Sequence, residues 1–146
     1  ILVRDEITGD VLSAKYSYTV TSAGIPAGGT GTVTIPSNIN IPSGMLIIRA
    51  GNACARTMIS TYIYTNMSLG HQSSVARDKV GVVTSSSGGA GASVSWGVKF
   101  PNVTGCADGG NGTQFDYTLV KTAADTYTIT NNGNVSKAYT ITVFRL

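Results

Sequence analysis

The chain of 146 residues has few charged side chains, since only 12% of its residues are Asp, Glu, Lys or Arg. Together with 42% hydrophobic residues, this excludes an intrinsically disordered chain, which shows the opposite balance. The net charge is +3, but the 10 Lys and Arg residues are scattered. A nucleic-acid-binding surface needs clustered basic residues with interleaved aromatic residues. We therefore expect no nucleic-acid partner.

Long hydrophobic runs and helical periodicity are also missing from the sequence. No stretch reaches the roughly 18 apolar residues of a membrane-spanning helix, so we expect no membrane insertion. Apolar residues nowhere recur at the 3.6-residue spacing of an amphipathic helix over three turns. These absences exclude a helical bundle and an α-helical membrane protein.

Residues that usually build catalytic and metal sites are scarce. His71 is the single histidine, and its segment SLGHQSS is typical of an exposed loop. One histidine among many serines does not indicate a Ser-His-Asp triad, which is defined by geometry. Cys54 and Cys106 stand far apart and lack the spacing of zinc ligands. We expect no enzyme activity, no cofactor and no bound metal.

Cys54 and Cys106 are nevertheless a candidate disulfide pair. Both lie beside loop-like segments, GNACAR and VTGCADGG. A disulfide requires Cα atoms within about 7 Å of each other, a distance that the sequence does not determine. A disulfide between them and a pair of free thiols therefore both stay open.

The sequence is rich instead in Thr, Val, Ile and Tyr, which favour β-strands. Apolar residues alternate with polar ones in SVSWGVKF (93–100), and RTMISTYIYT (56–65) predicts a long strand. The continuous apolar run MLIIRA (45–50) predicts a strand buried on both faces. Segments rich in Gly, Pro, Asn and Ser separate these runs. We predict one all-β domain over residues 1–146, an antiparallel β-sandwich of jelly-roll or immunoglobulin-like type with about 8–10 strands.

The first residues predict a β-hairpin at about residues 1–12. Two apolar runs, Ile1–Val3 and Val11–Leu12, flank the charged turn 5–10. This ribbon either belongs to its own domain or pairs with a neighbouring chain. We expect the former, because the turn is short and polar, whereas a donated strand is more often a single long extension.

Aromatic residues suggest core packing and subunit contacts. Trp96 shares a face with Val94 and Phe100, which favours core packing over a carbohydrate site. The strand of Tyr62 and Tyr64 is apolar on both faces, so one side of it is expected to meet a neighbouring subunit. Loop tips rich in glycine are expected to supply adaptable contacts. The candidate contact residues are Ile1, Leu2, Val3, Tyr62, Tyr64, Gly88, Gly89, Gly109 and Gly110.

The first quarter of the chain resembles small accessory virion proteins of tailed bacteriophages, which are associated with the tail tip or tail fibre. The resemblance consists of an apolar strand, an acidic turn with glycine, a second strand, and then a G-x-V-x-I-P strand. The matching positions are Leu2, Val3, Asp5, Gly9, Val11, Gly31, Val33, Ile35 and Pro36. The resemblance implies a structural role in the virion and no catalytic residues.

Two functions follow as hypotheses. The first is a structural virion protein whose partners are other copies of itself, neighbouring structural proteins and a host-surface receptor. The alternative is an exported, pilin-like filament or adhesin subunit at the cell surface, which assembles by β-strand donation. That alternative predicts an open groove in the isolated subunit. In an exported protein the two cysteines can form a disulfide. Glycans can also be attached at the Asn-x-Ser/Thr sequences of Asn66, Asn102, Asn111 and Asn134.

Overall fold

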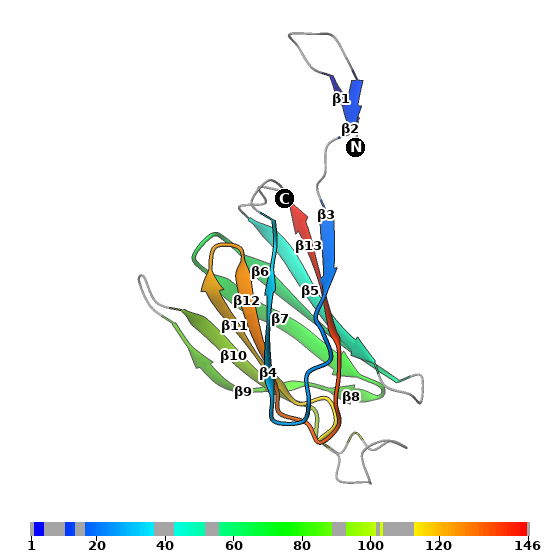
Figure 1. Cartoon of the computed structure of the whole chain (residues 1–146). Helices are drawn as coiled ribbons and strands as arrows, with labels where there is room; N and C mark the ends of the chain where they lie inside the picture. Colours follow the sequence, from blue (N-terminus) through cyan, green and yellow to red (C-terminus); the bar gives the residue numbers. More distant parts are fainter. Residues whose placement is uncertain are drawn as a thin grey trace.

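The protein folds as a sandwich of two antiparallel β-sheets, which confirms the predicted all-β sandwich class. Its two sheets contain 6 and 5 described strands, more than the 8–10 strands predicted. The computed structural model describes residues 2–4, 11–13, 17–36, 43–51, 56–88, 93–101, 103 and 113–145. One sheet has six strands and the other has five, and Figure 1 shows the two layers. Within the described residues there is no helix, and hence none that could cross a membrane.

The six-stranded sheet has the order β3-β13-β5-β6-β7-β8. Its long central strands form a meander, because β5, β6 and β7 pair antiparallel with their neighbours in the chain. The C-terminal strand lies between β3 and β5. The strands are β3 (Ser17–Thr21), β5 (Gly44–Gly51), β6 (Thr57–Tyr64), β7 (Leu69–Ala76), β8 (Lys79–Val80) and β13 (Tyr139–Arg145).

The five-stranded sheet has the order β4-β12-β11-β10-β9. The strands are β4 (Thr30–Thr34), β9 (Val82–Ser87), β10 (Val94–Lys99), β11 (Tyr117–Ala123) and β12 (Thr126–Asn131). The chain passes from β8 in the first sheet to β9 in the second through Gly81. A Cβ atom at Gly81 would lie 2.8 Å from the Phe100 ring and 2.6 Å from the Ser74 side chain. The close approach of the two sheets therefore requires glycine at this position.

The predicted N-terminal hairpin is present. Strand β1 (Leu2–Arg4) pairs antiparallel with β2 (Val11–Ser13), and Val3 lies opposite Leu12. These two strands form a sheet of their own, which Figure 1 shows beyond the end of β3. Among the described residues, neither strand has a ladder to the sandwich, so the hairpin does not extend either of the larger sheets.

The hydrophobic core lies between the two sheets and contains residues from both. The largest fully buried side chains include four tyrosines and two phenylalanines. On β6, Ile59 and Ile63 are exposed and Met58, Tyr62 and Tyr64 are buried, as the predicted alternation requires. Each sheet thus has one buried and one solvated face.

Two strand predictions need correction. The run MLIIRA does not form a strand buried on both faces: on β5, Leu46, Ile48 and Ala50 point into the core, whereas Met45 is 37% exposed. Only one face of this sheet is covered by the other sheet, so the run alternates like its neighbours. The segment SLGHQSS is not a loop but belongs to β7.

Candidate functional site

The single histidine and the single tryptophan meet between the two sheets. His71 on β7 and Trp96 on β10 belong to different sheets, and their ring centroids are 6.0 Å apart. The Trp96 Nε1–H donates a hydrogen bond of 2.7 Å to the carbonyl oxygen of Leu69. Trp96 is half-buried and packs against the core, and its position ties the two sheets together.

A β-bulge directs His71 inward. The pairing of β6 with β7 shifts register between Thr61 and Tyr62, where Gln72 is the extra residue. Ser74 and Ala76 point inward on one side of the bulge, and Leu69 and His71 point inward on the other side. The extra residue reverses the alternation. Sequence reasoning missed this position because it predicted an exposed loop here, and strict alternation along a strand would also have placed His71 outside.

His71 is the outer end of a chain of buried polar groups. Its Nε2 lies 2.7 Å from the Ser74 hydroxyl, which lies 2.6 Å from the Ser60 hydroxyl. The hydroxyls of Tyr62 and Tyr117 lie 2.7 Å apart and join the two sheets. Burial lowers the pKa of His71 and raises that of Tyr62, so both groups favour their neutral forms at neutral pH.

This cluster has the composition of a packing network rather than of a hydrolytic site. Ser74 is only 2% exposed and already shares its hydroxyl with Ser60. The ring contacts of His71 are Tyr62 and Trp96, whereas a triad needs a carboxylate to orient the imidazole and an accessible nucleophile. Across the described ranges, no three His, Cys, Asp or Glu side chains gather as metal ligands.

Lys121 is a second buried polar group, on β11. Its ammonium donates hydrogen bonds to the Ala124 carbonyl at 2.7 Å and to the Tyr127 hydroxyl at 3.0 Å. It also lies 4.5 Å from the centre of the Tyr127 ring. Burial lowers the pKa of Lys121 to about 8, and the charge of Asp125 opposes this shift. These contacts hold the turn between β11 and β12.

Asp116 is a buried carboxyl that joins the end of β10 to the start of β11. It accepts a hydrogen bond of 2.9 Å from the Phe100 backbone N–H. Burial raises the pKa of Asp116, while the Phe100 bond and the charge of Lys99 act in the opposite direction. The hydrogen bond between Asp116 and the Phe100 backbone connects β10 to β11.

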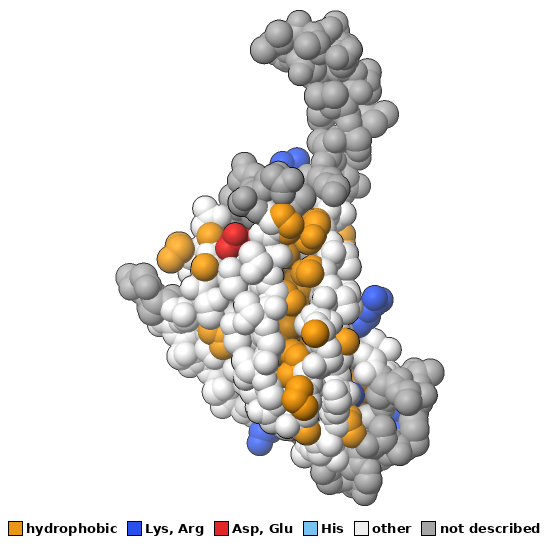
Figure 2. Space-filling view, viewed as in Figure 1, with side chains coloured by type: hydrophobic (Ala, Val, Ile, Leu, Met, Phe, Trp, Pro, Cys, Tyr) orange, Lys and Arg blue, Asp and Glu red, His pale blue; other side chains and the backbone are white. Residues whose placement is uncertain are grey.

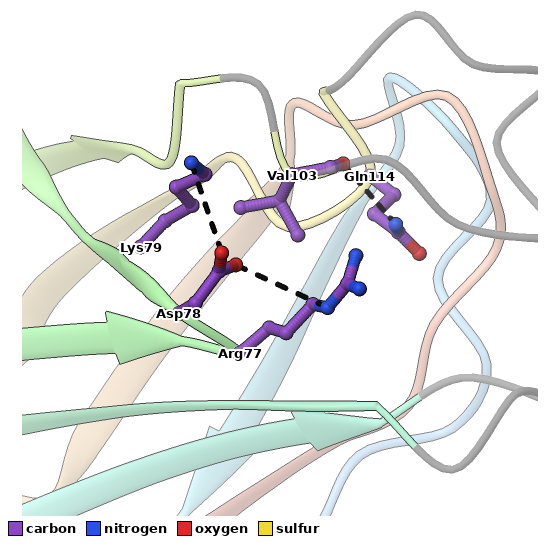
Figure 3. Close-up of polar contacts among 5 residues, drawn as sticks. All are labelled: Arg77, Asp78, Lys79, Val103 and Gln114. Atoms are coloured by element: carbon purple, nitrogen blue, oxygen red, sulfur yellow. Dashed lines mark hydrogen bonds and ion pairs between the residues drawn. The ribbon is translucent and has the colours of Figure 1, made fainter.

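The turn between β7 and β8 carries three exposed charged side chains, Arg77, Asp78 and Lys79. Asp78 lies 3.9 Å from Arg77 and 3.8 Å from Lys79 (Figure 3). Nearby, the Gln114 side-chain amide donates a hydrogen bond to the Val103 carbonyl. The ion pairs are exposed, so they contribute little to stability.

The outer face of the six-stranded sheet exposes apolar side chains that the core does not use. Met45 lies opposite Ile63 on the neighbouring strand, and Ile59 lies opposite Val75. Their exposed fractions are between 37% and 47%, and Val80 beside Val75 is 72% exposed. We call these five residues the apolar face. The five side chains share one sheet face, on which Thr61 lies between Ile59 and Ile63. Exposed apolar side chains grouped on one face are typical of protein contacts.

The predicted contact residues fall into three groups. Tyr62 and Tyr64 are 0% and 3% exposed, so the prediction that their side chains meet a neighbour is wrong, and Ile59 and Ile63 occupy the outer side of their strand. Leu2 and Val3 lie in β1, and Gly88 is exposed after β9. Outside the described residues lie Ile1, Gly89, Gly109, Gly110 and both candidate disulfide partners, Cys54 and Cys106.

The fold and these surfaces define an antiparallel β-sandwich protein that carries the apolar face on its six-stranded sheet. Comparison with known proteins found no matching family model, no matching curated protein and no matching solved structure.

Proposed function

We propose that this chain is a non-enzymatic structural protein of a tailed-phage virion, associated with the tail tip or tail fibre. It assembles with other copies of itself and with neighbouring structural proteins, and a host-surface receptor is a further partner in this proposal. The observation that carries the assembly role is the apolar face, because Ile59, Ile63 and their neighbours stay exposed on the outer side of the six-stranded sheet, away from the described core. The virion is the setting that the resemblance of the first quarter suggests.

Burial beside β3 and β4 favours this function over strand donation. A subunit that awaits a donated strand has an open groove with exposed core residues. Here Ile25 and Val33, next to this side of the sandwich, are only 3% and 5% exposed. The side chains of Tyr18 and Val20 on β3 are only half-buried. The burial of Ile25 and Val33 is therefore what supports the virion role over strand donation.

The test is to measure how much of the chain is present in purified phage particles, by quantitative mass spectrometry. The amount of the double variant Ile59→Thr/Ile63→Thr in the particles should be at least tenfold lower than that of the wild type. Its free energy of unfolding should change by no more than about 0.5 kcal/mol per exposed site. Met67→Thr is the matched control, since Met67 is 58% exposed but lies outside the apolar face. Absence of the wild-type chain from the particles contradicts the proposal.

An intact mass of the natively sourced chain, with and without reduction before thiol alkylation, separates the two hypotheses. Assembly in the cytosol predicts two free thiols and no added glycan, because disulfides are rare there. A Cys54–Cys106 disulfide, or hexose-sized additions at the four Asn-x-Ser/Thr sequences, would favour the exported filament.

A further inference from the structure

Two sheet edges on the same side of the sandwich carry none of the usual protection against pairing. Among the strands that the structure describes, β3 and β4 each pair on one side only and lie against each other. Neither contains a charged residue, a proline or a bulge, which are the common means of blocking an edge. The other two edges are better defended: β8 is two residues long and contains Lys79, and the β9–β10 ladder is interrupted at Gly97.

The free backbone groups of the β3 edge belong to Ser17, Thr19 and Thr21. The Ser22 N–H donates to the Tyr139 carbonyl, within the register that pairs Thr21 with Thr140. Hydrogen-bonded and non-hydrogen-bonded pairs alternate along an antiparallel ladder. Val20 and Tyr18 therefore bond to β13, and the N–H and C=O groups of the intervening residues point to the open side. The contact of 2.9 Å between the hydroxyls of Thr19 and Thr142 agrees with the closer, non-hydrogen-bonded pair.

The side-chain pattern of β3 is symmetric about Thr19. Strand β3 reads Ser-Tyr-Thr-Val-Thr, with the hydroxyl residues exposed and Tyr18 and Val20 half-buried on the inner side. If two such strands run antiparallel with Thr19 opposite Thr19, hydroxyl residues lie opposite hydroxyl residues. Tyr18 then lies opposite Val20 on the inner side. The same register pairs the free backbone groups and forms about six new hydrogen bonds.

We propose that two copies of this chain pair through β3 about a two-fold axis, which joins their six-stranded sheets into one continuous sheet. An isologous contact of this kind requires the self-complementary pattern that β3 has. Figure 2 shows a column of hydrophobic side chains down the side of the molecule where β3 and β4 lie. The pairing brings the half-buried Tyr18 and Val20 of β3 against the same residues of the second copy. The chain already joins its strands by opposed threonines, as in Thr21–Thr140 and Thr30–Thr130.

The β4 edge belongs to the same contact. In its sequence Thr-Gly-Thr-Val-Thr the exposed threonines are symmetric about Thr32, whereas the inner positions hold Gly31 and Val33. The Ile35 N–H donates to the Asp125 carbonyl, so the backbone groups of Thr30, Thr32 and Thr34 point to the open side. This second edge widens the surface on which the two copies meet. The inference deepens the assembly role proposed above and rests on it.

The test is the mass of the full chain in solution, measured by sedimentation equilibrium over a range of concentrations. The wild type should have twice the chain mass of 15.0 kDa, and Thr19→Pro should weaken the dimer at least tenfold. Thr19 donates no backbone bond to β13, and proline is tolerated at such an edge position. Thr19→Val, which keeps the edge N–H but loses the hydroxyl contact with Thr142, should stay dimeric.

Thr19→Lys is the second blocking variant, in case the proline variant does not fold. It places two ammonium groups opposite each other on the two-fold axis, so its dimer should be at least tenfold weaker and regain affinity as salt is added. A monomeric wild type, or a dimer that Thr19→Lys leaves unchanged, overturns the β3 contact. If Ile59→Thr/Ile63→Thr alone breaks such a dimer, the copies meet through the apolar face, and the assembly role stands without the edge contact.

Discussion

Raising the pH above neutrality should first stabilise this protein and then unfold it. Burial lowers the pKa of Lys121 from 10.5 to about 8, against the charge of Asp125, which acts to raise it. Between these pH values the unfolded chain keeps a proton that the folded protein has released. The free energy of unfolding rises with pH wherever the unfolded state binds more protons, so this contribution appears above pH 8.

The magnitude follows from the size of the shift. One pKa unit corresponds to about 1.4 kcal/mol, so the full shift of Lys121 sets an upper limit of about 3.5 kcal/mol. Only part of it develops before tyrosine ionisation begins, and solvent at the nearby turn screens part of the rest. We expect a gain of about 1 kcal/mol between pH 7 and pH 9, or about 2–4 °C in Tm for a domain of this size.

The buried tyrosines reverse this trend above pH 10. Burial raises the pKa of Tyr64 and Tyr117 to about 12, and it also raises those of Tyr62, Tyr127 and Tyr139. Tyrosines of the unfolded chain ionise near pH 10, so the unfolded state then releases protons that the folded state retains. Each tyrosine removes up to about 1.4 kcal/mol per pH unit, which is enough to unfold the protein between about pH 11 and pH 12.

The assay is urea unfolding at pH values from 7 to 11, with Lys121→Met beside the wild type. Methionine has no charge to bury at this position, so the variant should lack the rise between pH 7 and pH 9 and keep the fall above pH 10. Lys79→Met is the control, because the Lys79 ammonium lies at the surface beside Asp78. An equal rise in Lys121→Met and wild type would refute the assignment to Lys121.

Two further predictions concern stability. Arg77 has a φ of 56° in the turn before β8, so Arg77→Gly should raise the free energy of unfolding by about 0.5–1 kcal/mol in urea titrations, and a loss contradicts this. Tyr62→Phe and Tyr117→Phe should each cost about 1–3 kcal/mol, because each leaves the opposite buried hydroxyl without the partner now 2.7 Å away. A double-mutant cycle should show that the double variant costs less than the sum, and additive losses would rule out this coupling.

The period-2 pattern predicted the strands and much of the inside-outside assignment. Val98 and Phe100 are buried as expected, and Tyr62 points away from Ile59 and Ile63 on β6. The sequence does not show which side of β6 faces the core, because both faces of this strand are apolar. The covering sheet decides this, and it buries Tyr62 and Tyr64 against residues that are distant in the chain, such as Tyr117.

The site-like cluster was harder to predict than the strands. A single inserted residue, Gln72, reverses the direction of His71 and brings it to Ser74 and to Trp96 of the opposite sheet. Nothing in SLGHQSS marks this bulge, because its position depends on the pairing with β6. The buried position of Lys121 was equally hidden, since a lysine in an alternating strand is ordinarily solvated.

By itself the sequence determined the all-β class, the hairpin at the N-terminus and the alternation of most strands, because these depend on the spacing of neighbouring side chains. Only the tertiary structure decided the order of the strands in each sheet, the outward direction of the apolar face and the exposure of the β3 and β4 edges. These features arise from pairings between distant segments, such as β3 with β13 and β4 with β12. The physical reason is that an edge or a covered face is a property of what lies beside a strand, and local spacing carries no information about that neighbour.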